Sequence, residues 1–555
     1  MALDPYSSCP CGYGKKIKFC CPDLINDLDK VQSQIAGNQL ANALDTVKAL
    51  ESKYPNRACL LSYIALLGWA TRQHQLVDET TKRFLEHHPK NPIALAFHAM
   101  KLVRDGDLRG GQNALQDALE MCESELFESV YNAIVLMGQS MLGQGQILPA
   151  RGLLTLGMVV SKGQDQNVMQ ALMQLEGSPT IPALLKDVPG YMECEKNAPY
   201  RNEFEGALRL AGRGCWRKAA GVWKEILKKN PEDPSAHRNL AVALGYLGEY
   251  RASADEWRAY AELDIPADEE IEAEATAQLL RRDESEGQVD DLLVKFELRD
   301  YDRAEQALLA TRRAERLTID MSQYADNGQP PPRTVFALFN RERPQTSDNL
   351  KSTDVPLILG HVYLFGKETD RPAHVEIDVY RTHLETVLAT FREIVGDAFG
   401  GEISEEVTGQ VSNLELALSW QWRLPENTDW KNRMRLLRER RTHVLLDIWP
   451  TLRLPLLDDM TPAEASVDWN MRDRLQAAIM LLEMSDSSQA APEMFAKLRE
   501  KLGLPLPETL EPADFDYKRA HLPRFLYVPV EKLNDQQLRN SYQRVMVAQV
   551  LARRA

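Results

Sequence analysis

The sequence lacks three features that would each assign it to a broad class of protein. No apolar run reaches the length of about 18 residues that a membrane-spanning helix needs, and the longest candidate, residues 58–70, is shorter. The N-terminus has no basic start followed by an apolar core, so we predict no secretory signal and expect the reducing cytoplasm as the compartment. Positive charge is also in deficit. The 66 Lys+Arg face 81 Asp+Glu, a net charge of −15, which excludes a chain that binds nucleic acid over its whole surface.

The remaining composition is that of a folded protein. Hydrophobic residues make up 44% and charged residues 26% of the 555 positions, which excludes disorder over most of the chain. At about 150 residues per domain, the length predicts roughly three to four domains.

Cysteine is scarce, yet four of the eight cysteines lie within the first 21 residues. Cys9 and Cys11 form one close pair, and Cys20 and Cys21 form a second. Two such thiolate pairs can surround one soft divalent ion tetrahedrally, and zinc is the metal that this donor set favours. Four protein ligands leave no open position for a substrate. The spacing therefore predicts one structural zinc ion rather than a catalytic one.

The same run, Ser8-Cys-Pro-Cys-Gly-Tyr-Gly-Lys-Lys-Ile-Lys-Phe-Cys-Cys-Pro22, resembles the SEC-C motif. This zinc knuckle occurs at the C-terminus of the SecA translocation ATPase and in many stand-alone bacterial proteins. Only Tyr13 departs from the family pattern, which has a small residue there. In that family the knuckle is a docking surface. The resemblance implies zinc ligation by the four cysteines, and it implies partner contacts by Lys15, Lys16, Lys18 and Phe19.

A period of 34 residues runs through the first half of the chain. Pro55 and Pro89 stand 34 positions apart, and further units follow from Pro92, from Tyr131 and around Trp223. A small residue recurs midway along the first helix of each unit, where it lets the second helix approach: Ala65, Ala99, Gly138 and Ala241. The pattern resembles tetratricopeptide (TPR) repeats. We predict a knuckle over residues 1–24, TPR-like arrays over 25–165 and 200–318, and an irregular connector over 166–199. Asp300 to Ala304 is interpreted as a last, partial copy.

Proteins with TPR repeats bind ligands along the concave face that the first helices of the pairs form. The resemblance implies that residues at those positions line a partner site: Asn132, Gln139, Arg201, Arg238 and Tyr246. The Lys/Asn arrangement that clamps a C-terminal carboxylate in chaperone-binding members is absent in frame, so a chaperone-tail receptor is disfavoured.

The second half of the chain has a different pattern. Proline-rich residues 319–354 predict a linker, and residues 355–555 a helical domain. Alternating apolar residues over about 357–380 predict one β-hairpin within it. We expect helices over 381–395 and 405–421, and one that begins after Thr461 and runs to about Met484. A final amphipathic helix over 535–554 is expected to pack on this domain.

One basic segment stands out against the acidic average. Between residues 431 and 441 it carries Lys431, Arg433, Arg435, Arg438, Arg440 and Arg441. No aromatic platform or base-reading motif accompanies it, so a solvated helix face is favoured over contact with phosphate. His361, His374 and Glu376 around the hairpin are candidates for an enzyme site of unknown type, the least supported hypothesis.

The sequence thus predicts a mainly α protein. It would combine a TPR α-solenoid, an N-terminal four-cysteine zinc knuckle and a C-terminal helical domain with one β-hairpin. The leading functional hypothesis is a cytoplasmic, non-enzymatic adaptor for a protein partner, with secretion- and translation-linked proteins as candidate partners. The alternative is a factor that contacts the ribosome or nucleic acid through the knuckle lysines and the Arg433–Arg441 helix.

Overall fold

The computed structural model describes residues 4–122, 126–187, 190–281, 288–318, 331–369, 371–419, 421–485, 491–507, 510–513 and 522–547. The chain divides into two compact units. The first contains Met1–Arg281, Met480–Gln489 and Pro507–Ala555, and the second contains Arg282–Ile479 and Ala490–Leu506. Within the described ranges, every helix is too short or too polar to cross a bilayer.

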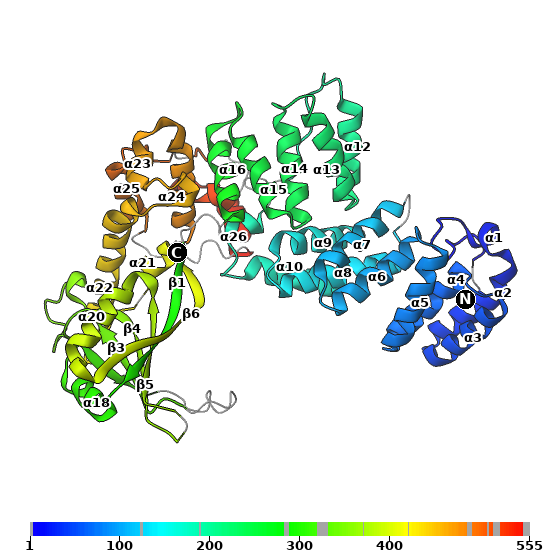
Figure 1. Cartoon of the computed structure of the whole chain (residues 1–555). Coiled ribbons are helices and arrows are strands. Elements are labelled where there is room, and N and C mark those ends of the chain that lie inside the picture. Colours follow the sequence, from blue (N-terminus) through cyan, green and yellow to red (C-terminus); the bar gives the residue numbers. More distant parts are fainter. Residues whose placement is uncertain are drawn as a thin grey trace. The chain divides into compact units, whose positions relative to one another are not determined.

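The first unit begins with helices that follow one another as antiparallel pairs (Figure 1). A short helix, α1 (Ile17–Cys20), precedes them. The pairs are α2 (Ile25–Ala36) with α3 (Leu40–Lys53), α4 (Ala58–Ala70) with α5 (His74–His87), α6 (Pro92–Arg104) with α7 (Leu108–Met121), and α8 (Glu128–Gly143) with α9 (Ile147–Val160).

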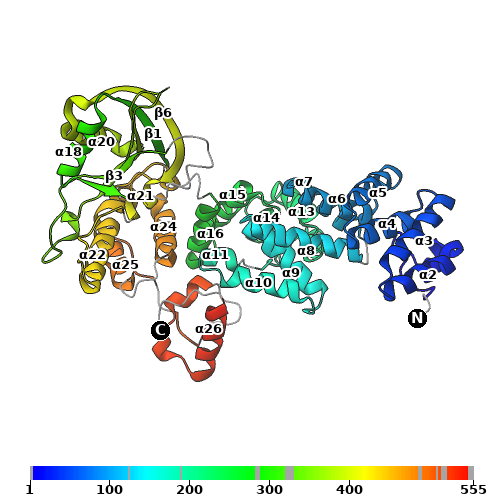
Figure 2. The same ribbon diagram turned by 90° about the horizontal axis from the view of Figure 1, so that it is seen from below.

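A second set of pairs follows in the same unit, and Figure 2 shows both sets from below. It contains α12 (Arg201–Gly212), α13 (Trp216–Leu227), α14 (Pro234–Tyr246), α15 (Tyr250–Ala261) and α16 (Ala267–Leu280). One contact recurs at the repeat distance. The Tyr131 hydroxyl donates to Asp165 at 2.6 Å, and Tyr200 donates to Asp233 in the same way. The TPR-like solenoid is therefore confirmed.

The predicted small residues lie where neighbouring helices meet. Ala65, Ala99 and Ala241 are fully buried. At Gly138 a Cβ atom would come within 3.1 Å of the Leu154 side chain, so the glycine permits the close approach of α8 and α9.

Two glutamines of α7 connect the first set of pairs to the second. Gln116, which is buried, donates from Nε2 to the Gly214 carbonyl at 2.9 Å, and its Oε1 accepts from the Arg217 backbone N–H at 3.1 Å. Gln112 donates to the Tyr246 carbonyl at 2.8 Å. Gln116 thereby caps the first turn of α13, whose N–H groups have no partner within their own helix.

The segment between the two sets is more regular than expected. It holds α10 (Gln166–Gly177) and the short α11 (Ala183–Lys186). Asp165 caps α10 by accepting from the backbone N–H groups of Asn167 and Val168. The prediction of an irregular connector over 166–199 is therefore wrong for its first part.

The second unit is built on a six-stranded antiparallel sheet with the strand order β2-β3-β4-β5-β1-β6. The strands are β1 (Gln288–Leu298), β2 (Ala314–Leu317), β3 (Thr334–Phe339), β4 (Ile358–Phe365), β5 (His374–Tyr380) and β6 (Phe399–Ser412). The predicted hairpin is confirmed as β4 and β5, with Val362 opposite Ile377. It forms the centre of a larger sheet.

Several predicted elements of this region are wrong. Residues 405–412 belong to strand β6, and only α21 (Asn413–Leu418) is helical within the predicted 405–421 helix. Strand β3 lies in the predicted linker, of which residues 319–330 fall outside the described ranges. Asp300–Ala304 is not a repeat copy. It opens α18 (Tyr301–Ala310), which packs with α20 (Leu384–Val395) over the apolar face of the sheet through Ala304, Leu308 and Phe391.

Helices complete both units. The second unit contains α22 (Trp430–His443), α23 (Pro462–Val467) and α25 (Ala491–Lys501), while α24 (Arg472–Ser485) spans the boundary. Thr461 caps α23 in a capping box with Glu464, as predicted. The predicted continuous helix to about Met484 is wrong, because α23 ends at Val467 and α24 begins separately at Arg472.

The last helix, α26 (Asp535–Val547), belongs to the first unit, so its expected packing on the C-terminal domain is wrong. It follows residues 522–527, where Arg524 pairs with Glu272 of α16 at 2.8 Å. Residues 548–554 of the predicted helix lie outside the described ranges.

Candidate metal centre and docking surface

The first four cysteines converge because the chain reverses sharply between them. The Cys9 backbone N–H donates to the Lys15 carbonyl at 2.8 Å, and Ser8 pairs with Lys16 in an antiparallel bridge. Gly12 lies within this reversal at φ +82°, a left-handed conformation that side chains resist. Helix α1 follows this reversal and ends at Cys20, which lies beside the first cysteine pair, Cys9 and Cys11.

Three of the sulfur atoms lie as close together as the ligands of one metal ion do. The Sγ atoms of Cys9, Cys20 and Cys21 all lie within 4.8 Å of one another. Cys11 Sγ lies 3.1 Å from Cys20 Sγ. Because zinc–thiolate bonds measure about 2.3 Å, tetrahedral ligand sulfurs lie roughly 3.8 Å apart. Cys9, Cys20 and Cys21 could therefore hold a metal ion, and Cys11 lies beside them next to Cys20.

A fifth cysteine, which the sequence did not point to, adjoins this cluster. Cys59, at the start of α4, is fully buried, and its Sγ lies 3.7 Å from Cys21 Sγ. Hydrogen bonds from Cys11 and then Cys59 lower the pKa of the Cys21 thiol. The contact with Cys21 and burial raise the pKa of the Cys59 thiol. The pKa values of Cys21 and Cys59 are thus shifted in opposite directions.

Three polar contacts fix the knuckle to the helical array. Buried Asn91 donates from Nδ2 to the Cys11 carbonyl at 2.6 Å, while its Oδ1 caps α6. A Cβ atom at Gly12 would lie 2.8 Å from that Oδ1, so a larger residue would push Asn91 away. The Tyr13 hydroxyl lies 2.7 Å from His88 Nδ1. Tyr13, the one departure from the motif pattern, therefore helps to anchor the knuckle.

The third contact is an ion pair in which both guanidinium NH groups of Arg57 donate to Asp23, each at 3.1 Å. Arg57 immediately precedes α4, so this pair ties the end of the knuckle to the same helix that carries Cys59.

The opposite side of the knuckle faces solvent. Phe19 is 71% exposed and Tyr6 is 58% exposed. Lys18 Nζ lies 3.3 Å from the centre of the Tyr6 ring and 4.6 Å from that of Phe19. Lys15 and Lys16 are exposed beside them. The implied contact residues thus form one basic and aromatic surface, which we call the knuckle face (Tyr6, Lys15, Lys16, Lys18 and Phe19).

The candidate partner residues of the helical array differ in their surroundings. Asn132 and Gln139 are exposed on α8, the first helix of its pair. Arg201 pairs with Glu205 at 2.7 Å, and Arg238 pairs with Glu269 at 3.2 Å, so an acidic neighbour already balances each charge. Tyr246 packs against Trp216, with ring centres 5.1 Å apart. Of the five residues, only Asn132 and Gln139 present side chains that are both exposed and uncharged.

The basic segment forms α22, whose charges are only partly free. Arg435 pairs with Glu439 at 2.6 Å and also donates to the Leu350 carbonyl. Burial lowers the pKa of Arg440. Lys431, Arg433 and Arg438 are exposed.

Of the three residues considered for an enzyme site, His374 and Glu376 lie together and His361 has a different acidic neighbour. His374 is buried and stacks on Phe365, with ring centres 4.5 Å apart, and its Nε2 lies 3.3 Å from Glu376. His361 instead lies 3.9 Å from Asp378. Burial lowers the pKa of both histidines.

Comparison with known proteins finds similarity among solved structures. No family model matches the chain, and no curated protein matches it. Among solved structures, the TPR domain of P58(IPK) aligns with 95% of this chain and 98% of its own length, at 13% identity and a TM-score of 0.20. A TM-score of 0.20 is too low to support a conclusion about the fold. The assignment of helical repeats therefore rests on the helix pairs described above.

Proposed function

We propose that the chain is a non-enzymatic adaptor with two docking surfaces for a protein partner. The first is the concave face of the helical array, where Asn132 and Gln139 are exposed on α8. The second is the knuckle face, on an SEC-C-like knuckle that binds one structural zinc ion through Cys9, Cys11, Cys20 and Cys21. The cytoplasm is the proposed compartment.

The observation that carries this proposal is the attachment of the knuckle to the array. Asn91, His88 and Arg57 hold the knuckle against the helices α4 to α6. A partner that touches both surfaces then meets a preformed arrangement and loses less entropy than it would on a freely tethered module. Such attachment is unnecessary for a knuckle that acts alone.

The chemistry of the knuckle face indicates the kind of partner surface it fits. Three lysines surround two exposed aromatic rings, so a complementary surface would present carboxylates around an apolar side chain. Aromatic residues at the centre of an interface commonly dominate its binding energy, which makes Phe19 the expected hot spot.

Affinity capture from lysate with the zinc-loaded full chain tests the adaptor role. Two double variants each alter one surface: Lys18→Glu with Phe19→Ser, and Asn132→Glu with Gln139→Glu. Lys30→Glu is the matched control, because Lys30 is an exposed lysine on α2 outside both surfaces. Each double variant should capture less of the same partner than the unaltered chain does. The control variant should capture as much as the unaltered chain. Capture that neither double variant changes would contradict the proposal.

The alternative function is contact with ribosome or nucleic acid through the knuckle lysines and α22. Exposed Lys431, Arg433 and Arg438 favour it. Binding of this kind falls steeply between low and physiological salt, because it releases counterions from phosphates. Retention on immobilised RNA at low salt is the expected result, and its absence there would exclude the alternative.

A further inference from the structure

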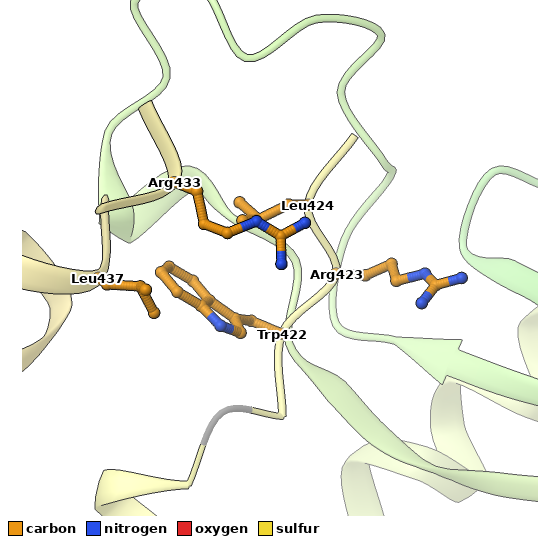
Figure 3. A pocket seen from close by; sticks show the side chains of 5 residues that line it. All are labelled: Trp422, Arg423, Leu424, Arg433 and Leu437. Carbon is orange, nitrogen blue, oxygen red and sulfur yellow. The ribbon is translucent and has the colours of Figure 1, made fainter. Parts of the chain in front are cut away.

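A pocket in the second unit lies where residues 422–424 pass α22. It has a volume of about 460 Å³ and is lined by Trp422, Arg423, Leu424, Arg433 and Leu437 (Figure 3). None of these residues belongs to the surfaces proposed for the adaptor.

Backbone contacts hold both walls of the pocket in place. The Ile358 N–H donates to the Gln421 carbonyl at 2.7 Å, and the Arg423 N–H donates to the Pro356 carbonyl at 2.9 Å. Trp422 thereby forms an antiparallel bridge with Leu357, next to strand β4. The other wall, α22, begins at a capped turn, where Asp429 accepts from the Asn432 N–H.

The two arginines of the pocket differ in how their charge is balanced. Arg423 points away from Trp422, and its Nε lies 2.6 Å from Glu315 (Figure 3). Arg433 reaches from α22 toward the space beside the Trp422 indole (Figure 3). Within the described ranges its guanidinium has no ion-pair or hydrogen-bond partner. The pocket therefore combines an aromatic ring, two leucines and one available cation.

This combination selects for a ligand that is both planar and anionic. An indole offers a stacking surface for a flat ring, and a guanidinium binds phosphate through two parallel N–H groups. Leu424 and Leu437 add apolar side walls against which a flat ring can pack. Lys431 and Arg438, exposed on the same helix, add positive charge that would attract neighbouring phosphates in an acidic chain.

We propose that this pocket binds a nucleotide unit, with the base stacked on Trp422 and the phosphate held by Arg433. The ligand is either a free mononucleotide or one unit of a single-stranded RNA. The inference goes beyond the adaptor role and gives the alternative function, contact with nucleic acid, a defined site. It also supplies an aromatic platform for α22 from outside the basic segment, because Trp422 precedes that segment in the chain.

Fluorescence anisotropy of a labelled ten-nucleotide RNA with the zinc-loaded full chain at low salt tests this site. Unlabelled AMP and UMP serve as competitors. Anisotropy is preferable to intrinsic fluorescence because the chain has nine tryptophans. Trp422→Ala should weaken binding about 5- to 100-fold, since one stacked base contributes on that scale. Trp422→Phe should restore most of the affinity. Arg433→Ala should weaken binding and lower the salt slope by about one.

Trp469→Ala is the matched control, because Trp469 is 77% exposed in the same unit and lies outside the pocket. Competition by the mononucleotides would assign a free nucleotide as ligand, whereas binding of the oligonucleotide alone would assign a strand. Both outcomes support the site. Absence of binding at low salt, or binding that Trp422→Ala and Arg433→Ala leave unchanged, would overturn it. Displacement by an acidic aromatic peptide but not by nucleotides would also overturn it, in favour of a peptide ligand.

The variants that test the adaptor lie on the knuckle and α8, so the two proposals can fail independently. If Trp422→Ala does not fold, as judged by circular dichroism, Trp422→Phe and Arg433→Ala still decide the result.

Discussion

Asn91 connects the cysteine cluster to the helical array through one side chain. Its Nδ2 donates to the Cys11 carbonyl at 2.6 Å, and its Oδ1 accepts from the backbone N–H of Ile93 at 3.0 Å. The residue that starts helix α6 therefore also positions Cys11, a proposed metal ligand. Loss of this side chain should affect both the stability of the array and the affinity for the metal.

Two substitutions at Asn91 separate these effects. Serine can still cap α6 but is too short to reach Cys11, whereas alanine loses both functions. Asn91→Ser should lower zinc affinity about 10-fold or more with little loss of array stability. Asn91→Ala should lose about 0.5–2 kcal/mol of stability in addition. Competition with a chromogenic chelator and thermal unfolding measure the two effects. Equal stability of the two variants would contradict the capping role.

Cys59 should tune the metal site without being one of its ligands. Cys59→Ala removes the thiol 3.7 Å from Cys21, so we expect zinc to remain at one ion per chain with an affinity lowered about 10-fold. Cys21→Ser should lower affinity much further, because it removes a ligand. Cys215→Ala is the matched control, a buried cysteine of the same unit outside the cluster. Loss of zinc from Cys59→Ala equal to that from Cys21→Ser would instead make Cys59 a ligand.

Gln116 should stabilise the junction between the two sets of helix pairs. Gln116→Leu keeps the approximate volume but leaves the Gly214 carbonyl and the Arg217 N–H without partners. We expect a loss of about 1–3 kcal/mol, measured by urea unfolding of the full chain. Gln144→Leu, an exposed position after α8, should change stability far less. A neutral Gln116→Leu would show that the junction does not depend on this side chain.

The pH dependence of the second unit should reflect two aspartates with opposite shifts. Burial and the neighbouring Asp291 raise the pKa of Asp378 to about 6, above the unfolded value of 3.8. The folded state then binds this proton more tightly than the unfolded state, so its stability falls as the pH rises from about 4 to 6. Asp378→Asn should raise the melting temperature at pH 8, with a smaller difference toward pH 4. Calorimetry of the full chain measures the melting temperature at both pH values.

Asp290 is the matched control for this prediction. Hydrogen bonds from Gln410 and Arg381 lower the pKa of Asp290 in the folded state. Ionised Asp290 therefore stabilises the fold above its unfolded pKa, and this stabilisation is lost as the pH falls through its folded pKa. Asp290→Asn should therefore lower the melting temperature at pH 8. A shift of the same sign in both variants would contradict the assignment.

The sequence predicted the elements whose signal is local. The 34-residue period and the small residues at helix contacts identified the helix pairs. The alternation of Val375, Ile377 and Val379 identified strand β5, and the spacing of the first four cysteines identified the cluster. Each of these patterns depends on residues close together in the chain.

The missed elements depend on contacts between distant segments. Strand β6 is exposed along most of its length, so it has no burial pattern, and its glutamates favour a helical interpretation. It exists because it pairs with β1, more than 100 residues earlier. Strand β3 is a short, fully buried run that periodicity cannot distinguish from a helix. Cys59 and Trp422 likewise acquire their roles only when Cys21 and Arg433 fold against them.

Hydrogen exchange of the full chain with and without a zinc chelator tests the central claim, that the metal-loaded knuckle and the helical array form one docking unit. We predict that chelation removes protection from residues 9–21 and also from the helix starts at Ala58 and Pro92, because Cys59, Arg57 and Asn91 lose their partners. Deprotection confined to residues 9–21, or no change at all, would contradict the claim.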